Sequence, residues 1–168
     1  IIDLGSNSVR LVLMEITQNG SYRLIDEINQ AVRLSENMEP DEFLKPKPME
    51  RAVKTINLYK KLCWANGIEV KNVIPVATEA VRRAKNRDEF LSMLKEQTGF
   101  VFRVLSGEEE ALLVYSGVVN TLEVTDALIM DLGGASTELV HVSGRKAENY
   151  VSIPLGSVTM TEKYLNGT

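Results

Sequence analysis

The chain is 168 residues long, with 44% hydrophobic and 25% charged residues, a composition typical of a globular protein. Its formal net charge of −4 argues against a nucleic-acid polymer as partner, because such partners are bound by strongly basic surfaces. The apolar runs are far too short to cross a bilayer, so no membrane segment is expected. The single cysteine, Cys63, can form no internal disulfide, which fits a cytoplasmic protein.

The chain opens inside a strand-like run without a basic leader, so we expect further residues upstream of Ile1 and no secretion signal. Hydrophobic spacing and turn residues then predict the elements in chain order. Strands are predicted at 1–4, 9–16 and 22–28, a loop at 36–48, a helix at 49–65, a strand at 72–77, helical segments at 79–85 and 88–97, a strand at 100–105 and a helix at 107–121. Gly5 and Asn19-Gly20 mark the first turns, and Gly67 ends the long helix.

These elements follow the order βββαβαβα. Three antiparallel strands followed by strands that are joined through helical crossovers form a mixed sheet with helices packed on it. A charged, turn-prone stretch at 120–126 follows, so we expect a complete α/β lobe at 1–124 and the start of a second lobe at 125–168. The second part is expected to contain opening strands, beginning at 127–132, and a short helix after Gly156.

The opening of the chain recurs near residue 131. With an offset of 128, the aligned identical residues are Asp3-Leu4-Gly5 with Asp131-Leu132-Gly133, Ser8 with Ser136, Leu11 with Leu139 and Val12 with Val140. Identities at these positions in equivalent strand–turn–strand units indicate an internal duplication.

Each copy has a turn of small residues directly after a strand that carries an aspartate. The first turn contains Gly5, Ser6, Asn7 and Ser8, and the second contains Gly133, Gly134, Ala135, Ser136 and Thr137. Glycine and short side chains let the backbone close around an anion, and the N–H groups of such turns bind phosphate. An ordinary β-turn with capping hydroxyls is the better explanation of either turn alone, but the pair favours two phosphate-binding loops.

Four segments resemble the exopolyphosphatase and guanosine-pentaphosphate phosphatase (Ppx/GppA) family. They are Asp3-Leu4-Gly5-Ser6-Asn7-Ser8, Ala77-Thr78-Glu79-Ala80-Val81-Arg82, Ser106-Gly107-Glu108-Glu109-Glu110-Ala111 and Asp131-Leu132-Gly133-Gly134-Ala135-Ser136-Thr137-Glu138. The segment 153–157 is also similar to the family's entry into its second lobe. The resemblance implies a ribonuclease H-like (actin-like ATPase) α/β lobe and the start of a second, similar lobe.

The resemblance also assigns chemistry to particular residues. Glu110 matches the family's catalytic glutamate and is expected to activate water for attack on a terminal phosphorus. Arg82 and Arg10 are expected to bind phosphate oxygens, Arg82 with a catalytic role, because guanidinium groups match phosphate geometry. The ligands expected to hold Mg²⁺, directly or through water, are Asp131, Glu138 and Asp3.

Physical chemistry alone leaves simpler explanations open. Glutamates at 108–110 are favourable at the start of any helix, whatever else they do. The cations Arg83, Lys85 and Arg87 could guide a polyanion, but a solvated helix surface explains them better. We interpret Cys63 as a core residue and His141 as a structural strand residue, since they lie in separate segments and do not form a thiol–imidazole pair.

The implied reaction is hydrolysis of a terminal phosphoanhydride, in inorganic polyphosphate or in the stringent-response nucleotide guanosine pentaphosphate, within a cleft between two lobes. A non-catalytic nucleotide-binding regulatory module of the same superfamily is the alternative, and a homodimer is compatible with both. Two departures from the family stand out. Ala135 replaces a glycine that is usual in the second loop, and family members continue beyond Thr168, so we expect these 168 residues to be part of a longer enzyme and inactive alone.

Overall fold

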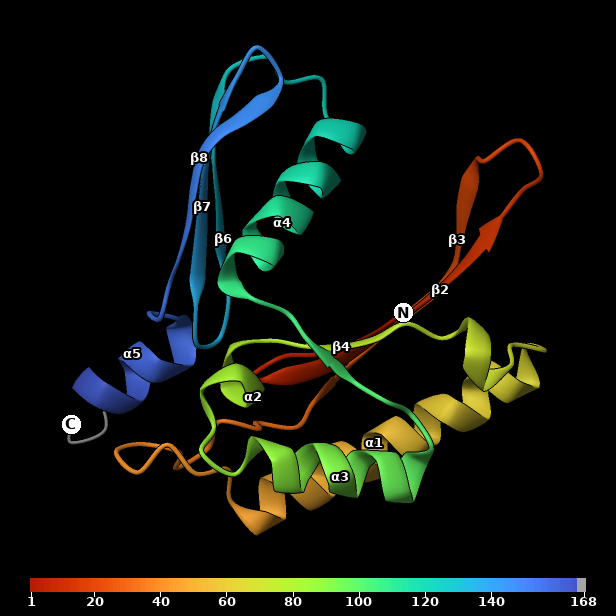
Figure 1. The fold of residues 1–168 in the computed structure, drawn as a ribbon, viewed down its shortest axis with the longest axis vertical. Coiled ribbons are helices and arrows are strands. Elements are labelled where there is room, and N and C mark those ends of the chain that lie inside the picture. The colour runs from red at the N-terminus through yellow and green to blue at the C-terminus, as the bar shows by residue number, and fades with distance from the viewer. Residues whose placement is uncertain (166–168) are drawn as a thin grey trace. The chain divides into compact units, whose positions relative to one another are not determined.

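The computed structural model describes residues 1–165, and the chain divides into two compact units, Ile1–Val104 and Leu105–Thr168. Figure 1 shows the elements of both. The sequence predicts the boundary near residue 124, and the two differ in the helix at 107–121, which packs with the residues of the second unit.

A five-stranded mixed sheet forms the centre of the first unit. Its strands are β1 (Ile2–Leu4), β2 (Ser8–Ile16), β3 (Tyr22–Ala31), β4 (Pro75–Ala77) and β5 (Arg103–Val104), in the spatial order β3-β2-β1-β4-β5. Strand β1 pairs antiparallel with β2 and parallel with β4, which confirms the predicted mixed sheet. Strands β4 and β5 are shorter than predicted, and a 3₁₀ turn (Val70–Asn72) occupies the beginning of the predicted fourth strand.

The helices of this unit are α1 (Pro46–Ala65), α2 (Glu79–Arg83) and α3 (Arg87–Thr98). Helix α1 begins at Pro46, inside the segment predicted as loop, because proline is well tolerated in a first helical turn. Figure 1 shows α1 and α3 side by side, and both bury apolar residues in one core with β1 and β2. The hydroxyl of Tyr59, a fully buried residue of α1, donates to the carbonyl oxygens of Val9 (3.0 Å) and Ile28 (3.2 Å) and so ties the helix to β2 and β3.

Up to residue 165, the second unit contains a three-stranded antiparallel sheet and two helices. Its elements are α4 (Gly107–Thr121), β6 (Ala127–Leu132), β7 (Thr137–Ser143), β8 (Lys146–Ile153) and α5 (Ser157–Tyr164), and the strands lie in the order β6-β7-β8. Ala111 and Val119 of α4 pack against Ile129 of β6 and against Val140 and Val142 of β7. This apolar contact is the physical reason why α4 folds with the second sheet.

The predicted internal duplication is present in the strand register. In the first unit Asp3 lies opposite Arg10 and Leu4 opposite Val9. In the second unit Asp131 lies opposite Glu138 and Leu132 opposite Thr137, which are the same four positions shifted by 128. The two hairpins therefore have the same register as well as similar sequences.

Candidate functional site

The two predicted loops form the same hydrogen-bonded turn. The N–H of Gly5 donates to the carbonyl oxygen of Ser8, and the N–H of Gly133 donates to that of Ser136, both at 2.9 Å. A Cβ atom would lie 3.2 Å from the Ser8 oxygen if added at Gly5, and 3.1 Å from the Ser136 oxygen if added at Gly133. Both turns are thus too tight to accept a side chain at the glycine without moving.

The first loop is held by the segment that follows β3. The carbonyl oxygen of Asn7 accepts hydrogen bonds from the N–H groups of Val32 (2.9 Å) and Arg33 (2.7 Å). The same segment contacts Ser6, whose carbonyl oxygen accepts from the N–H of Ser35 at 3.0 Å. In a trans peptide C=O and N–H point in opposite directions, so the N–H group that follows each engaged carbonyl points away from this support.

Arg51 of α1 in turn holds the supporting segment. Its Nε donates to the carbonyl oxygen of Val32 at 2.9 Å, and its guanidinium also pairs with the carboxylate of Glu36. The backbone of Arg33 has φ = 47°, an uncommon value for a residue with a side chain, which fits a segment held in place by several bonds. Sequence reasoning did not single out Arg51, because its contacts with residues 19 and 15 positions away leave no local pattern.

A row of polar residues crosses the second sheet next to the second loop. Asp131 lies opposite Glu138, and Glu138 lies opposite Ser152 on β8. Paired residues share a face of the sheet, and so do residues two positions apart on one strand. Ile129 lies two positions before Asp131 and Val140 two positions after Glu138, so the polar row lies on the face that α4 covers. Glu138 is only 2% exposed, and its Oε1 accepts a hydrogen bond from Ser152 Oγ at 2.7 Å.

The equivalent row in the first unit has a different charge balance. Asp3 lies opposite Arg10, and Arg10 Nε is 3.4 Å from the Glu27 carboxylate in an exposed ion pair. Within residues 1–165 no group of three or more Asp, Glu, His or Cys side chains has the geometry of a metal site. The pair Asp131 and Glu138, two carboxylates on neighbouring strands, is accordingly the better candidate for attracting a cation, and Asp3 remains a prediction.

The start of α4 separates the roles of its three glutamates. Ser106 caps the helix, its Oγ accepts from the N–H of Glu109 (3.1 Å), and the Glu109 carboxylate accepts from the N–H of Ser106 (2.9 Å). Glu109 is thus part of a capping box. Glu108 is exposed, whereas Glu110 is half-buried directly before Ala111, which is fully buried.

The direction of α4 brings Glu110 to the loop end of the second sheet. The C-terminal half of the helix is anchored at the β7–β8 turn, where Tyr115 donates to the carbonyl oxygen of Arg145 (2.6 Å) and Arg145 donates to that of Val119. The 15 residues of α4 span about 22 Å and the 7 of β7 about 23 Å, so helix and strand are of matching length. The first turn of α4 consequently lies toward the end of the sheet where β6 reaches Asp131 (Figure 1).

Arg82 lies in α2 and is engaged by its own helix. Its Nε donates to the Glu79 carboxylate at 2.9 Å, and both side chains are largely buried. The pairing fixes the plane of the guanidinium.

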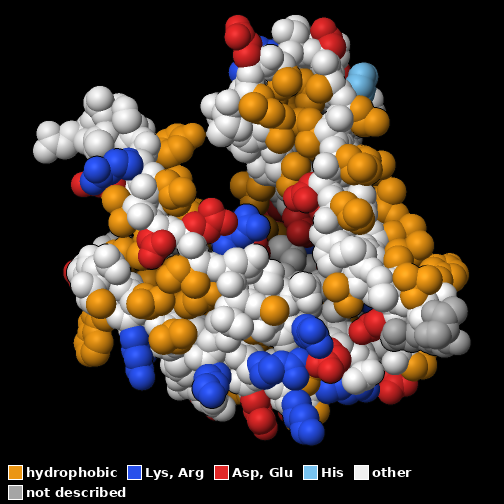
Figure 2. Space-filling model, turned by 180° about the vertical axis from the view of Figure 1, so that it is seen from behind, with side chains coloured by type: hydrophobic (Ala, Val, Ile, Leu, Met, Phe, Trp, Pro, Cys, Tyr) orange, Lys and Arg blue, Asp and Glu red, His pale blue; other side chains and the backbone are white. Residues whose placement is uncertain are grey.

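The neighbouring cations form ion pairs, Lys85 and Arg87 as exposed residues and Arg83 as a largely buried one. Arg83 pairs with Glu39 and Glu42, Lys85 lies 3.7 Å from Glu42, and Arg87 lies 3.5 Å from Asp88. Figure 2 likewise shows lysine and arginine side chains interspersed with acidic ones in this view. The interpretation as a solvated surface is confirmed for Lys85 and Arg87 and is wrong for Arg83, whose side chain is only 25% exposed because it packs between its acidic partners and α2.

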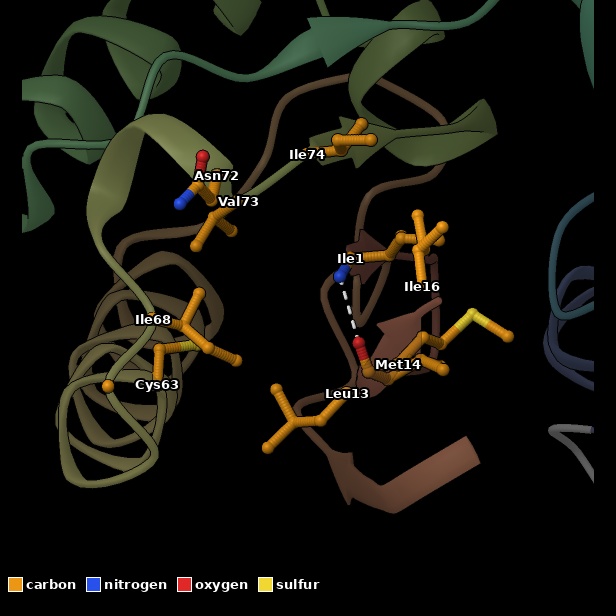
Figure 3. A pocket seen from close by; sticks show the side chains of 11 residues that line it. Ile1, Leu13, Met14, Ile16, Cys63, Ile68, Asn72, Val73 and Ile74 are labelled. Carbon is orange, nitrogen blue, oxygen red and sulfur yellow. Dashed lines mark hydrogen bonds between the residues drawn. The ribbon is translucent and has the colours of Figure 1, made fainter. Parts of the chain in front are cut away.

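A cavity of about 480 Å³ in the first unit lies at the opposite end of β1 from the loop (Figure 3). It lies beside Ile1 and Ile74, which precede the parallel strands β1 and β4, and its wall includes Cys63 and Ile68. Ligands of open α/β sheets bind at the carboxyl ends of the strands, and this cavity is at the amino ends and mostly apolar. Burial raises the pKa of the Cys63 thiol, so a nucleophilic role for it is disfavoured.

The mixed sheet, the repeated hairpin and the paired glycine turns define an actin-like α/β protein. A family model described as the Ppx/GppA phosphatase family matches residues 12–168. The chain belongs to the Ppx/GppA phosphatase family. No helix in the part of the chain that the structure describes has the length and apolar character needed to cross a membrane.

Solved structures and a curated relative agree with this assignment. A Ppx/GppA family member from Aquifex aeolicus is 35% identical with a TM-score of 0.79, over 97% of this chain and 53% of that chain. An exopolyphosphatase from Cytophaga hutchinsonii has a TM-score of 0.90 at 24% identity, over 97% and 52% of the two chains, and supports the fold alone. A bifunctional 3-dehydroquinate synthase/phosphatase from Fusobacterium nucleatum is 33% identical over 170 residues, 97% of this chain and 26% of that protein. The chain spans about half the length of these structures and a quarter of the curated relative.

Proposed function

We propose that the whole protein hydrolyses a terminal phosphoanhydride, with inorganic polyphosphate or guanosine pentaphosphate as substrate. The observation that carries this proposal is the repeated glycine turn: in each copy the loop carbonyls are hydrogen-bonded within their own unit, so that the following N–H groups point away from that support and can bind phosphate. Membership of a phosphatase family supports the reaction class.

Glu110 acts as the general base in this proposal. Its carboxylate accepts a proton from water, the water oxygen forms a bond to the terminal phosphorus, and the bond to the bridging oxygen breaks, leaving a chain shorter by one phosphate. Arg82, already oriented by Glu79, contacts the oxygens of the transferred phosphoryl group as negative charge develops. The capping role of Glu109 and the exposure of Glu108 leave Glu110 as the best placed of the three.

Asp131 and Glu138 are the residues that would hold Mg²⁺. Their chemistry fits, because this ion takes hard oxygen ligands and is commonly bound by one or two carboxylates together with substrate phosphates and water. When bound, the ion would neutralise phosphate charge. Ser152 contributes by fixing one oxygen of Glu138, so that the second oxygen keeps a defined direction.

The test is phosphate release by the full-length protein with Mg²⁺, compared across long-chain polyphosphate, guanosine pentaphosphate and ATP. We expect at least one of the first two to be hydrolysed about tenfold faster than ATP or more. Binding of these compounds without any release of phosphate would overturn the proposal and favour the non-catalytic regulatory module.

A further inference from the structure

The first turn of α5 is packed directly against the second loop. The N–H of Ser157 donates to the carbonyl oxygen of Gly133 at 2.9 Å, and its hydroxyl donates to the same oxygen at 3.1 Å. The N–H of Val158 donates to the carbonyl oxygen of Gly134 at 2.8 Å. The free N–H groups that begin this helix are therefore satisfied by the loop, which becomes part of the helix cap.

Gly156 makes this close approach feasible. Its φ of −132° and ψ of 171° are open to any residue, so the backbone conformation does not require glycine. The available space does: an added Cβ would lie 2.3 Å from the nitrogen of Ala135 and 2.5 Å from the carbonyl oxygen of Gly134. Both are backbone atoms, so no side chain fits here unless the loop moves.

The peptide that Gly156 contacts is the middle of the second loop. Its carbonyl, from Gly134, is bonded to α5, and so its N–H, from Ala135, points the other way. We propose that Gly156 is a positioning residue for the reaction: it lets α5 seat against the Gly134–Ala135 peptide, which directs the loop N–H groups toward the phosphate chain. This inference rests on the proposed function.

The first loop supports the same interpretation. Its carbonyls at Ser6 and Asn7 are bonded by residues 32–35 after β3, as those of the second loop are bonded by α5 after β8. Each copy of the repeat thus uses the segment after its third strand to hold its own loop, although the two segments differ in structure.

The experiment compares Gly156→Ala with Gly117→Ala in the full-length protein. Relieving the clash requires the contact to open from 2.3 Å to at least 3.4 Å, a shift of about 1.1 Å (3.4 − 2.3). Displacements of about 1 Å cost about a hundredfold in rate. We expect Gly156→Ala to lower kcat at saturating substrate about a hundredfold and to weaken tripolyphosphate binding, measured by calorimetry well below the unfolding temperature. Gly117 has no atom within 4 Å of an added Cβ, so Gly117→Ala should keep both values.

Wild-type kcat and tripolyphosphate affinity in Gly156→Ala would overturn the proposal. If Gly156→Ala does not fold, Ser157→Ala decides, because it removes only the hydroxyl bond to Gly133: a several-fold lower kcat supports the proposal and an unchanged kcat overturns it. A wild-type protein that releases no phosphate refutes the proposed function instead, and the tripolyphosphate affinities of the variants then decide the positioning role.

Discussion

Replacing Arg51 by methionine should loosen the support of the first loop. The substitution keeps most of the aliphatic stem but removes the bond from Nε to the Val32 carbonyl and the ion pair with Glu36. The side chains of this pair are 42% and 38% exposed, so the ion pair contributes about 0.5 kcal/mol. The part-buried charged hydrogen bond contributes about 1 to 1.5 kcal/mol. We expect the free energy of unfolding to fall by about 1.5 to 2 kcal/mol.

The assay is urea denaturation of the full-length protein, with tripolyphosphate affinity measured in parallel. Lys54→Met is the matched control, since Lys54 is exposed on the same helix and should change the unfolding free energy by less than about 0.5 kcal/mol. Arg51→Lys should resemble Arg51→Met, because lysine keeps the charge but not the guanidinium fork. Affinity for tripolyphosphate should fall about tenfold in Arg51→Met, because a binding site works only when its groups are held to within about half an ångström. Equal stability and affinity in Arg51→Met and Lys54→Met would refute the reasoning.

Three further predictions concern charge and burial. Arg82→Ala should weaken tripolyphosphate binding more than Arg87→Ala at any salt concentration, and equal losses would make Arg82 one member of a diffuse basic surface. The backbone N–H of Gly144 and the hydroxyl next to it lower the pKa of Asp126. Its stabilising contribution is therefore present above the unfolded pKa and is lost as the pH falls through the lower folded pKa. Asp126→Asn should accordingly differ from wild type in thermal stability at pH 7 and converge with it in acid. A difference that does not depend on pH would contradict this. Cys63 is buried and its pKa is raised, so a thiol reagent at pH 8 should modify it only after unfolding, in contrast to rapid labelling of the native protein.

The sequence predicted the parts of the site that depend on local chemistry. The turn at Gly5 and its copy at Gly133 followed from small residues after a strand, and the structure forms the same hydrogen bond in both. Helix α4 begins at the predicted residue, directly after the Ser106 cap. A capping box involves only four consecutive residues, so this helix start depends on local sequence.

The parts that depend on long-range packing were missed. The sequence of α4 shows that the helix has apolar residues to bury but not which sheet they cover, and in the structure they pack on the second sheet. Two prolines made the start of α1 resemble a loop. Gly156 stood in a segment similar to the family, yet its contact with the Gly134–Ala135 peptide joins residues about twenty positions apart and has no signature in the local sequence.

The central claim is that Glu110 activates the attacking water, and Glu110→Gln measures it most directly. The full-length wild type, Glu110→Gln and Glu108→Gln are compared for Mg²⁺-dependent phosphate release, with thermal unfolding as the control for folding. We expect Glu110→Gln to be about a hundredfold slower or more, because losing a general base costs this much, and Glu108→Gln to keep the wild-type rate. A folded Glu110→Gln enzyme with wild-type turnover would contradict the assignment.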